Sequence, residues 1–385
     1  MKRNKLTISN LPETISTNGL TVQEAAEVEQ LKLFTDIHFE GLRSNSLSNT
    51  FPLYDLWSRF VRLKTTIFPI RQAPERLVNS RSISDKLDGI EYDGELQIAP
   101  AVLKGEETDY VAWPSDREEK VERALISLAT KGNISKINSP RGTRYAIHFK
   151  MNELNAELRS VNQSLSFPDL KQALLILSGA RLSFKFRTII DGEVDEKENN
   201  MPYLGSIHFS GKKGPSSQRC IVFLNEYMAQ QIETLSYKGY YFNQAQQFKR
   251  TLSSWLTTRL YTLFRYASPE KTYHFMLVKI MIKFGSIESE DISENRLVAI
   301  RRNMTSTMKD LINAGILEKY DILSVKDNDD KVVDYKYTLY PTEGFCDEIV
   351  SLNKHAKKLK LKSEALDAAI EDNSEEAVEA VSLES

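Results

Sequence analysis

The chain has 385 residues, with 51 Lys and Arg against 53 Asp and Glu, giving a net charge of −2. Its length predicts two or three domains with sizeable cores, and its composition is ordinary for a folded protein. It has no uncharged apolar run of about 18 residues, no signal-peptide pattern, and two well separated cysteines, Cys220 and Cys346. We therefore expect a cytoplasmic protein without a membrane span or disulfides.

Residues 1–114 are predicted to form a partly helical N-terminal extension. A capping-box pattern at residues 21–24 predicts a helix over 21–39, and Pro52 predicts the first turn of a second helix reaching Leu63. Residues 71–115 carry scattered prolines, glycines and acids, which predicts a linker or loosely structured strands. The sequence assigns no function to this extension.

Residues 115–235 predict a first domain of three helices followed by a hairpin. The helices are expected over 115–130, 151–159 and 167–179. A short strand is expected over 144–149, and apolar and polar residues alternate over 181–190 as in a half-buried strand. An acidic loop, 191–200, should separate that strand from strands at 203–210 and 219–224. A helix over 226–235 closes the domain. This order is typical of a winged helix.

Residues 236–350 predict a second domain of the same layout. A long helix is expected over 244–267, followed by a strand-to-helix step over 272–285. A further amphipathic helix begins at Ser293 and ends at Gly315, a residue typical of helix ends. The wing is expected from strands at 316–325 and 332–340. Its tip, residues 326–331, is acidic with a lysine at each end, which argues against deep insertion into a minor groove.

The helix that begins at Ser293 is the strongest functional signal in the sequence. One stripe is apolar and comprises Leu297, Ile300, Met304, Met308 and Leu311. The opposite face carries groups that can hydrogen-bond a phosphate or a base edge: Asn295, Arg302, Ser306, Lys309 and Asn313. Most amphipathic helices with a few basic residues are only solvated surface helices. The adjoining hairpin and the similar upstream domain favour a DNA-reading helix instead.

The distribution of charge supports DNA binding weakly. The tail after Lys362 has eight acidic residues and no Lys or Arg, so removing it changes the net charge from −2 to +6. Residues 241–320 have twelve Lys and Arg against seven Asp and Glu. We expect residues 351–385 to be a basic run followed by a disordered acidic tail. Such a tail could compete with phosphate and lower non-specific DNA affinity, or it could have no effect.

Familiar enzyme motifs are missing from the sequence. The five histidines are scattered, and the segment 205–213 lacks the spacing and the Ser or Thr of a phosphate loop. We therefore expect no enzyme activity, no catalytic or metal site and no cofactor. The aromatic cluster 240–242 is better explained by core packing than by base stacking. Arg259 lies in an apolar stripe, so a structural pairing with a carboxylate or carbonyls is expected rather than a DNA contact.

The order of elements resembles the theta-type, iteron-binding plasmid replication initiators. The resemblance covers residues 115–345 and rests on VERALISLAT, PDLKQALLILSGARLSF, TLSSWLTTRLYTLFRYA and MKDLINAGILEKYDI. It implies an α+β fold with two consecutive winged-helix domains, preceded by the partly helical extension and followed by the disordered tail. The extension and the tail depart from the compact form of that family.

The resemblance also implies partners and contact residues. The second winged helix would read repeated origin sites in double-stranded DNA, and the first would support dimerisation. Dimers would repress their own gene, whereas monomers would open the origin with the host initiator and recruit the replicative helicase, which implies plasmid copy control. The expected DNA contacts are Arg296, Arg301, Arg302, Asn303, Ser306 and Lys309, with Lys249 and Arg250 before the long helix and Lys185 and Arg187 on the first wing.

Two alternatives remain open at this stage. A winged-helix transcriptional regulator would use the same residues on an operator, and an inverted repeat beside the gene would favour it over an array of direct repeats. A replication enzyme such as a primase or nickase would need a carboxylate cluster on a metal. For self-association, Leu170, Leu174 and Leu177 on the helix 167–179 suggest that residues 115–235 hold the dimer interface, while 236–350 stay monomeric.

Overall fold

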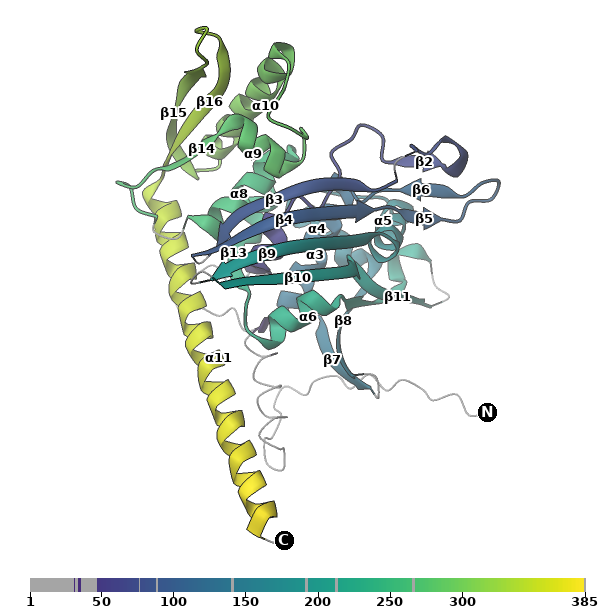
Figure 1. The fold of residues 1–385 in the computed structure, drawn as a ribbon. Helices are drawn as coiled ribbons and strands as arrows, with labels where there is room; N and C mark the ends of the chain where they lie inside the picture. Colours follow the sequence, from purple (N-terminus) through teal and green to yellow (C-terminus); the bar gives the residue numbers. More distant parts are fainter. Residues whose placement is uncertain are drawn as a thin grey trace.

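The structure is a computed structural model (Figure 1). It describes residues 31, 34–35, 47–75, 77–87, 89–139, 142–190, 193–211, 214–264 and 267–383. These residues form a mixed α/β fold with several antiparallel sheets. The helix predicted over 21–39 lies mostly outside the described residues. Within it, Leu31 and Phe34 are helical and buried in the core.

A central sheet joins the N-terminal region to the predicted first domain. Its order is β10-β9-β4-β3, and its strands are β3 Asn79–Leu87, β4 Ile90–Ala99, β9 Arg181–Ile190 and β10 Glu193–Pro202. Residues 79–99, predicted as a linker or loosely structured strands, form a regular hairpin. The predicted acidic loop over residues 191–200 was wrong, because residues 193–202 form a strand. The acidic strand is compatible with the sheet because Glu196 lies opposite Arg187 and Glu198 opposite Lys185.

The other predicted elements of the first domain are confirmed. Ser115 caps the helix that follows it through a capping box with Glu118. The helices are α3 Asp116–Thr130, α4 Met151–Ser160, α5 Phe167–Gly179 and α6 Glu226–Glu233. A second sheet has the order β11-β12-β8-β7, with strands β7 Ile134–Ser139, β8 Gly142–Lys150, β11 Leu204–Ser210 and β12 Arg219–Leu224. Strand β7 was not predicted.

The C-terminal half repeats this order of elements. Its members are α8 Thr251–Leu263, β14 Tyr273–Met276, α9 Leu277–Phe284, α10 Glu294–Asn313, β15 Leu317–Lys326 and β16 Val332–Pro341. We call this set the second unit, and the matching set α3, β8, α4, α5, β11 and β12 the first unit. In both, the third strand lies between the first two, in the orders β8-β12-β11 and β14-β16-β15. The β9–β10 hairpin is inserted between α5 and β11.

Two predicted helices are shorter than expected. Helix α2 spans Pro52–Leu56 and ends because Trp57 is extended and Arg59 Nε donates a hydrogen bond to the Tyr54 carbonyl, at 2.7 Å. The long helix predicted from Gln244 is divided into α7, Phe242–Gln246, and α8, with an extended Arg250 before α8. The divided chain turns so that α8 packs against α10.

Buried ion pairs fasten residues 54–62 to α3. Arg59 is paired with Glu122 at 2.7 Å and with Asp55 at 2.6 Å, and Arg123 is paired with Asp55 at 2.8 Å. All four side chains are almost fully buried. The predicted boundary between residues 114 and 115 therefore passes through a shared core, in which Trp57 also packs on Phe184.

Two small sheets complete the N-terminal half and connect it to the rest. Strand β1, Leu47–Thr50, pairs with β13, Lys238–Tyr241. The other sheet has the order β2-β6-β5, with β2 Ile67–Pro69, β5 Ala101–Leu103 and β6 Tyr110–Ala112. Because β13 precedes the second unit, the β1–β13 pair ties the start of the described chain to its middle.

Residues 351–383 of the predicted C-terminal tail belong to a long helix. Helix α11 spans Glu343–Leu383, packs on β13 and runs down the side of the molecule beyond the sheets (Figure 1). The disorder predicted for the acidic tail is therefore not confirmed. The tail is rich in Ala and Glu, which favour helix, so the helix that begins at Glu343 can continue through it.

Because of Lys238 on β13, the free energy of unfolding should depend on pH in the alkaline range. Its ammonium group is buried, donates a hydrogen bond to the Tyr261 carbonyl at 2.7 Å, and has its pKa lowered by burial to about 8. The unfolded chain keeps this proton up to a pH of about 10. The free energy of unfolding of the wild type, less that of Lys238→Met, should therefore rise by about 2 kcal/mol between pH 7.5 and 9.5.

Urea unfolding at several pH values tests this prediction. Measurements should stop at pH 9.5, because burial raises the pKa of Tyr203 and of other tyrosines, and their ionisation in the unfolded chain lowers stability above pH 10. Burial also raises the pKa of Cys220 and of Cys346, and their ionisation in the unfolded chain lowers the stability of both proteins equally, so only the difference between the proteins reports on Lys238. A difference that stays constant between pH 7.5 and 9.5 would show that Lys238 is solvated.

Candidate nucleic-acid interface

Helix α10 has the two faces that the sequence predicted. The apolar stripe is buried, with Leu297 and Ile300 at 5% and 3% exposure and Met304, Met308 and Leu311 at 0%. Ser293 caps the N-terminus by accepting a hydrogen bond from the Arg296 amide, and Gly315 ends the helix with a φ of 71°. The helix is thus fixed in rotation, and its polar face points away from the core.

Four predicted contact residues on this face are available for a ligand. Arg302, Asn303 and Lys309 are exposed, and Ser306 is half-buried. Within the described part of the chain, none of these four side chains makes a hydrogen bond or an ion pair. Arg302 and Lys309 therefore present two uncompensated positive charges, and Asn303 and Ser306 present neutral donors and acceptors beside them.

Two further predicted residues are already engaged. Arg296 donates a hydrogen bond to the Ser286 carbonyl at 2.6 Å. Arg301 donates one to the Tyr335 hydroxyl at 3.1 Å, and its guanidinium lies 4.3 Å from the centre of that ring. Arg301 thus connects α10 to the hairpin β15–β16, which was predicted as the wing.

Arg250 and Lys249 lie immediately before α8 and are both exposed. Arg250 forms an ion pair with Asp310 of α10 at 2.9 Å, and the Ser253 hydroxyl donates to the same carboxylate at 2.6 Å. Lys249 has no polar partner among the described residues. The structure therefore brings this predicted pair to the end of α10 that carries Lys309.

Lys185 and Arg187 are placed differently from the prediction. They lie on β9, which pairs with β4 and β10, so they do not belong to a hairpin of the first unit. Lys185 lies 4.0 Å from Glu198, and Arg187 lies 3.6 Å from Asp93. Carboxylates from both neighbouring strands flank these two cations, which weakens their attraction for phosphate.

The tip of the hairpin β15–β16 is closed by its own polar groups. Lys326 pairs with Asp330 at 2.8 Å, and Asp327 accepts hydrogen bonds from the amides of Asp329 and Lys331, both at 3.0 Å. A turn organised around carboxylates is poorly suited to a minor groove, in agreement with the sequence. Leu323, just before the tip, is 66% exposed.

Arg259 has the structural role expected for it. Its guanidinium is buried and donates to Asp85 of β3 at 2.7 Å, and a longer contact of 3.4 Å reaches the Leu56 carbonyl. Asp85 also pairs with Lys283 of α9 at 2.6 Å. One carboxylate of the central sheet thus holds two helices of the second unit. No pattern in the sequence indicated that Asp85 would be the partner of Arg259.

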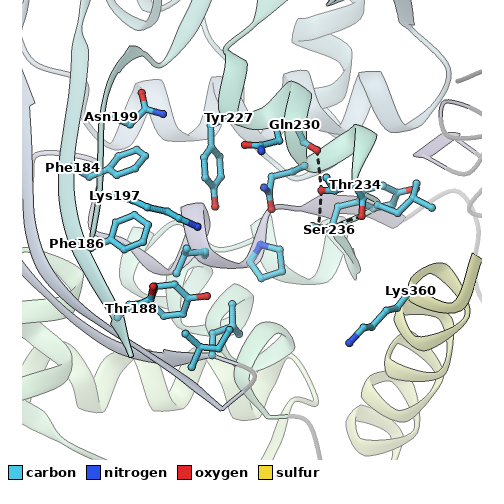
Figure 2. Close-up of a pocket in the computed structure, with 18 of the residues that line it drawn as sticks. Phe184, Phe186, Thr188, Lys197, Asn199, Tyr227, Gln230, Thr234, Ser236 and Lys360 are labelled. Atoms are coloured by element: carbon cyan, nitrogen blue, oxygen red, sulfur yellow. Dashed lines mark hydrogen bonds between the residues drawn. The ribbon is translucent and has the colours of Figure 1, made fainter. Parts of the chain in front are cut away.

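A cavity of about 990 Å³ lies between the central sheet, α6 and α11 (Figure 2). Phe184, Phe186 and Tyr227 form its aromatic side, and Lys197 and Lys360 point toward it from opposite sides. None of its lining residues belongs to α8, α9, α10 or the sheet β14-β16-β15. The cavity is therefore separate from the polar face of α10.

The described residues contain no group of three or more His, Cys, Asp and Glu placed to hold a metal ion. Both cysteines, Cys220 and Cys346, are buried and unpaired. In the same part of the chain, every helix is too short or too polar to cross a bilayer.

Comparison with known proteins gives structural neighbours only. No family model and no curated protein matches the chain. Similar solved structures include a selenomethionine derivative of RctB domains 2 and 3, with 11% identity, a TM-score of 0.46, and coverage of 75% of this chain and 98% of the other. A second structure of RctB domains 2-3 has 12% identity, a TM-score of 0.42, and coverage of 75% and 96%.

A third neighbour is a Pi initiator protein in complex with iteron DNA. It has 12% identity and a TM-score of 0.38, and the match covers 59% of this chain and 91% of the other. The predicted resemblance to a replication initiator is thus confirmed. At TM-scores below 0.5 this likeness assigns no role to any residue, so the functional argument rests on the geometry of α10.

Proposed function

We propose that the chain is a sequence-specific double-stranded DNA-binding protein that initiates plasmid replication by binding repeated sites at an origin. The observation that carries the proposal is the polar face of α10. Arg302 and Lys309 are exposed and unpaired among the described residues, while the opposite stripe is fully packed. A fixed helix with free cations, an amide and a hydroxyl is suited to a major groove.

The repeated topology supports two winged helices in this proposal. Each unit has the order helix, strand, helix, helix, strand, strand, with the last strand in the middle of its sheet. In the second unit, α10 is the third helix and therefore the recognition helix, and β15–β16 is the wing. In the first unit, these places belong to α5 and to β11–β12.

The first unit is proposed to play an auxiliary part. The exposed charges of α5 are Asp169 and Lys171, which offer phosphate no net attraction. The predicted dimer contact through Leu170, Leu174 and Leu177 is wrong, because all three side chains are 0% exposed within the core. Self-association, repression of the chain's own gene, and action with a host initiator and a replicative helicase belong to the proposal, with no contact residues assigned.

A transcriptional regulator is the second candidate, because it would use the same α10 face. Direct repeats in the DNA beside the gene favour initiation, and a single inverted repeat favours regulation. We propose binding without catalysis, and an assay for divalent-metal-dependent cleavage or primer synthesis on the same DNA tests that choice. Either activity, if abolished by a point variant of a carboxylate, would contradict it.

Substitutions on α10 test the proposed reading helix. Arg302→Ala should lose about 1–3 kcal/mol of specific binding and relax the preference at one base pair, because a bidentate base contact is removed. Lys309→Ala should weaken binding to all duplexes similarly. It should also make the slope of log K against log salt concentration shallower by about 0.9, the value for one phosphate. The measurement is titration of the full chain with DNA from beside its gene and with random duplex.

Lys104→Ala provides the matched control for these variants. Lys104 is an exposed cation beyond β5, outside both units, so its removal changes net charge equally without touching α10. It should leave specific binding unchanged. If both α10 variants bind like the control, or if the wild-type chain prefers no duplex over random DNA, the proposed function is wrong.

A further inference from the structure

The carboxylate of Asp310 is an unusual feature of a surface offered to DNA. It lies on α10 next to Lys309, near the polar face, where its negative charge should repel phosphate. Its side chain is 22% exposed and is held from two directions. Ser253 Oγ donates to Oδ2 at 2.6 Å, and Arg250 Nη1 lies 2.9 Å from Oδ1 and 3.0 Å from Oδ2.

Arg250 uses only some of its N–H donors in the ion pair with Asp310. A guanidinium has five N–H donors in a planar fork, and the contacts to Asp310 come from Nη1 alone. Neither Nε nor Nη2 of Arg250 has a partner among the described residues, and the side chain is 47% exposed. One side of the fork is thus fixed, and the other faces solvent.

The pair also has a defined place in the fold. Arg250 is the N-cap residue of α8, and that helix has no acidic residue in its own first turn. Asp310 supplies a carboxylate there from α10. Arg250 is thereby held at the junction of the two helices, beside the end of α10 that bears Lys309.

We propose that Asp310 is a positioning residue that holds Arg250 as a phosphate clamp at the end of the recognition helix. Its negative charge therefore strengthens DNA binding rather than weakening it. This inference rests on the proposed function, since it adds Arg250 as a third cation to Arg302 and Lys309 on the α10 surface. Arg250 binds the phosphate with the donors that Asp310 leaves free, and Asp310 reduces the rotamer freedom lost on binding.

The sign of one substitution separates positioning from simple charge. If Asp310 acts only through its charge, Asp310→Asn removes a repulsion and should tighten DNA binding. If Asp310 positions Arg250, the same change should weaken binding by about threefold, the size of an exposed ion-pair coupling. Arg250→Ala should weaken DNA binding by about tenfold and make the slope of log K against log salt concentration shallower by about 0.9.

The experiment is a double-mutant cycle on the full chain. Wild type, Asp310→Asn, Arg250→Ala and the double variant are titrated with DNA from beside the gene and with random duplex, at several salt concentrations. In the Arg250→Ala background, Asp310→Asn should no longer weaken binding, because the clamp is already gone. Tighter binding by Asp310→Asn, or an equal loss in both backgrounds, overturns the inference. A wild-type chain with no preference among duplexes overturns the proposed function instead.

Two further variants keep the result interpretable if Asp310→Asn loosens the fold. Arg250→Lys retains the charge but has a single nitrogen head, so it cannot hold Asp310 and a phosphate with separate arms of a fork. It should lose about as much affinity as Asp310→Asn, and wild-type affinity would contradict the clamp. Ser253→Ala removes the other bond to Asp310 but keeps the ion pair, so its affinity loss should be smaller than that of Asp310→Asn. An equal loss would indicate a structural effect.

Discussion

Replacing Asp85 with alanine should lower the free energy of unfolding by about 3–5 kcal/mol. The carboxylate is 7% exposed and pairs with Arg259 at 2.7 Å and with Lys283 at 2.6 Å. Without it, the buried guanidinium of Arg259 keeps only neutral neighbours, namely the Leu56 carbonyl at 3.4 Å, the Tyr273 side chain and the Trp255 ring, and its Nε already lacks a partner among the described residues. An uncompensated buried charge is costly because no water can replace the lost carboxylate.

The matched control for Asp85→Ala lies on the same hairpin. Glu91 pairs with Lys86 at 2.9 Å, but both side chains are more than 60% exposed, so Glu91→Ala should change stability by less than about 0.5 kcal/mol. Urea unfolding of both variants measures the difference. A loss below 1 kcal/mol for Asp85→Ala would show that water reaches Arg259. Because Asp85 joins the central sheet to α8 and α9, its loss should also increase protease cleavage between the units.

The sequence predicted the local features of the candidate interface well. The burial of Met304 and Met308 and the exposure of Arg302 and Lys309 follow from helical periodicity alone, which depends only on neighbours along the chain. The structural role of Arg259 followed from the cost of burying a guanidinium. In both cases the physical constraint acts on the residue itself, so no knowledge of distant partners was needed.

Most of the missed features depend on distant partners. Strand β10 is acidic and resembles a loop until Lys185 and Arg187 of β9 lie opposite its carboxylates. Strand β4 does alternate over residues 90–98, but Gly94 and the acidic residues around it resemble a turn, and the pairing of β4 with β9 spans about ninety residues of sequence. The separation of α7 from α8 places Arg250 against Asp310, a contact that helical periodicity over 244–267 could not indicate.

Replacing Glu122 with alanine should also cost about 3–5 kcal/mol of stability, and it tests whether residues 47–113 belong to the core of the first unit. Glu122 is 2% exposed, accepts from Arg59 Nη1 at 2.7 Å and from the Tyr54 hydroxyl at 3.1 Å. Both partners precede the predicted boundary at residue 115. If that boundary separated two independent domains, Glu122 would be solvated in the first unit and its replacement would have little effect.

A paired substitution distinguishes the cost of an unpaired charge from the value of the ion pair. In the double variant Arg59→Met with Glu122→Leu, both charges are removed and apolar volume replaces them. Asp55 keeps Arg123 at 2.8 Å and the Phe51 amide at 2.9 Å, so no charge of the network is left alone. The double variant should therefore recover most of the stability lost by Glu122→Ala, as measured by urea unfolding.

Exposed and buried carboxylates should respond differently in this test. Glu198→Ala removes an exposed partner of Lys185 and should change the free energy of unfolding by less than about 0.5 kcal/mol. If Glu122→Ala matches this control, the ion pairs between α3 and residues 54–62 are surface contacts. If the double variant is as unstable as the single one, the loss comes from packing around Tyr54 rather than from the excess positive charge left when Arg59 and Arg123 share Asp55. If the double variant recovers stability that Glu122→Ala loses, residues 54–62 and α3 share a core. The charges of Arg59 and Glu122 can then be removed together but not singly.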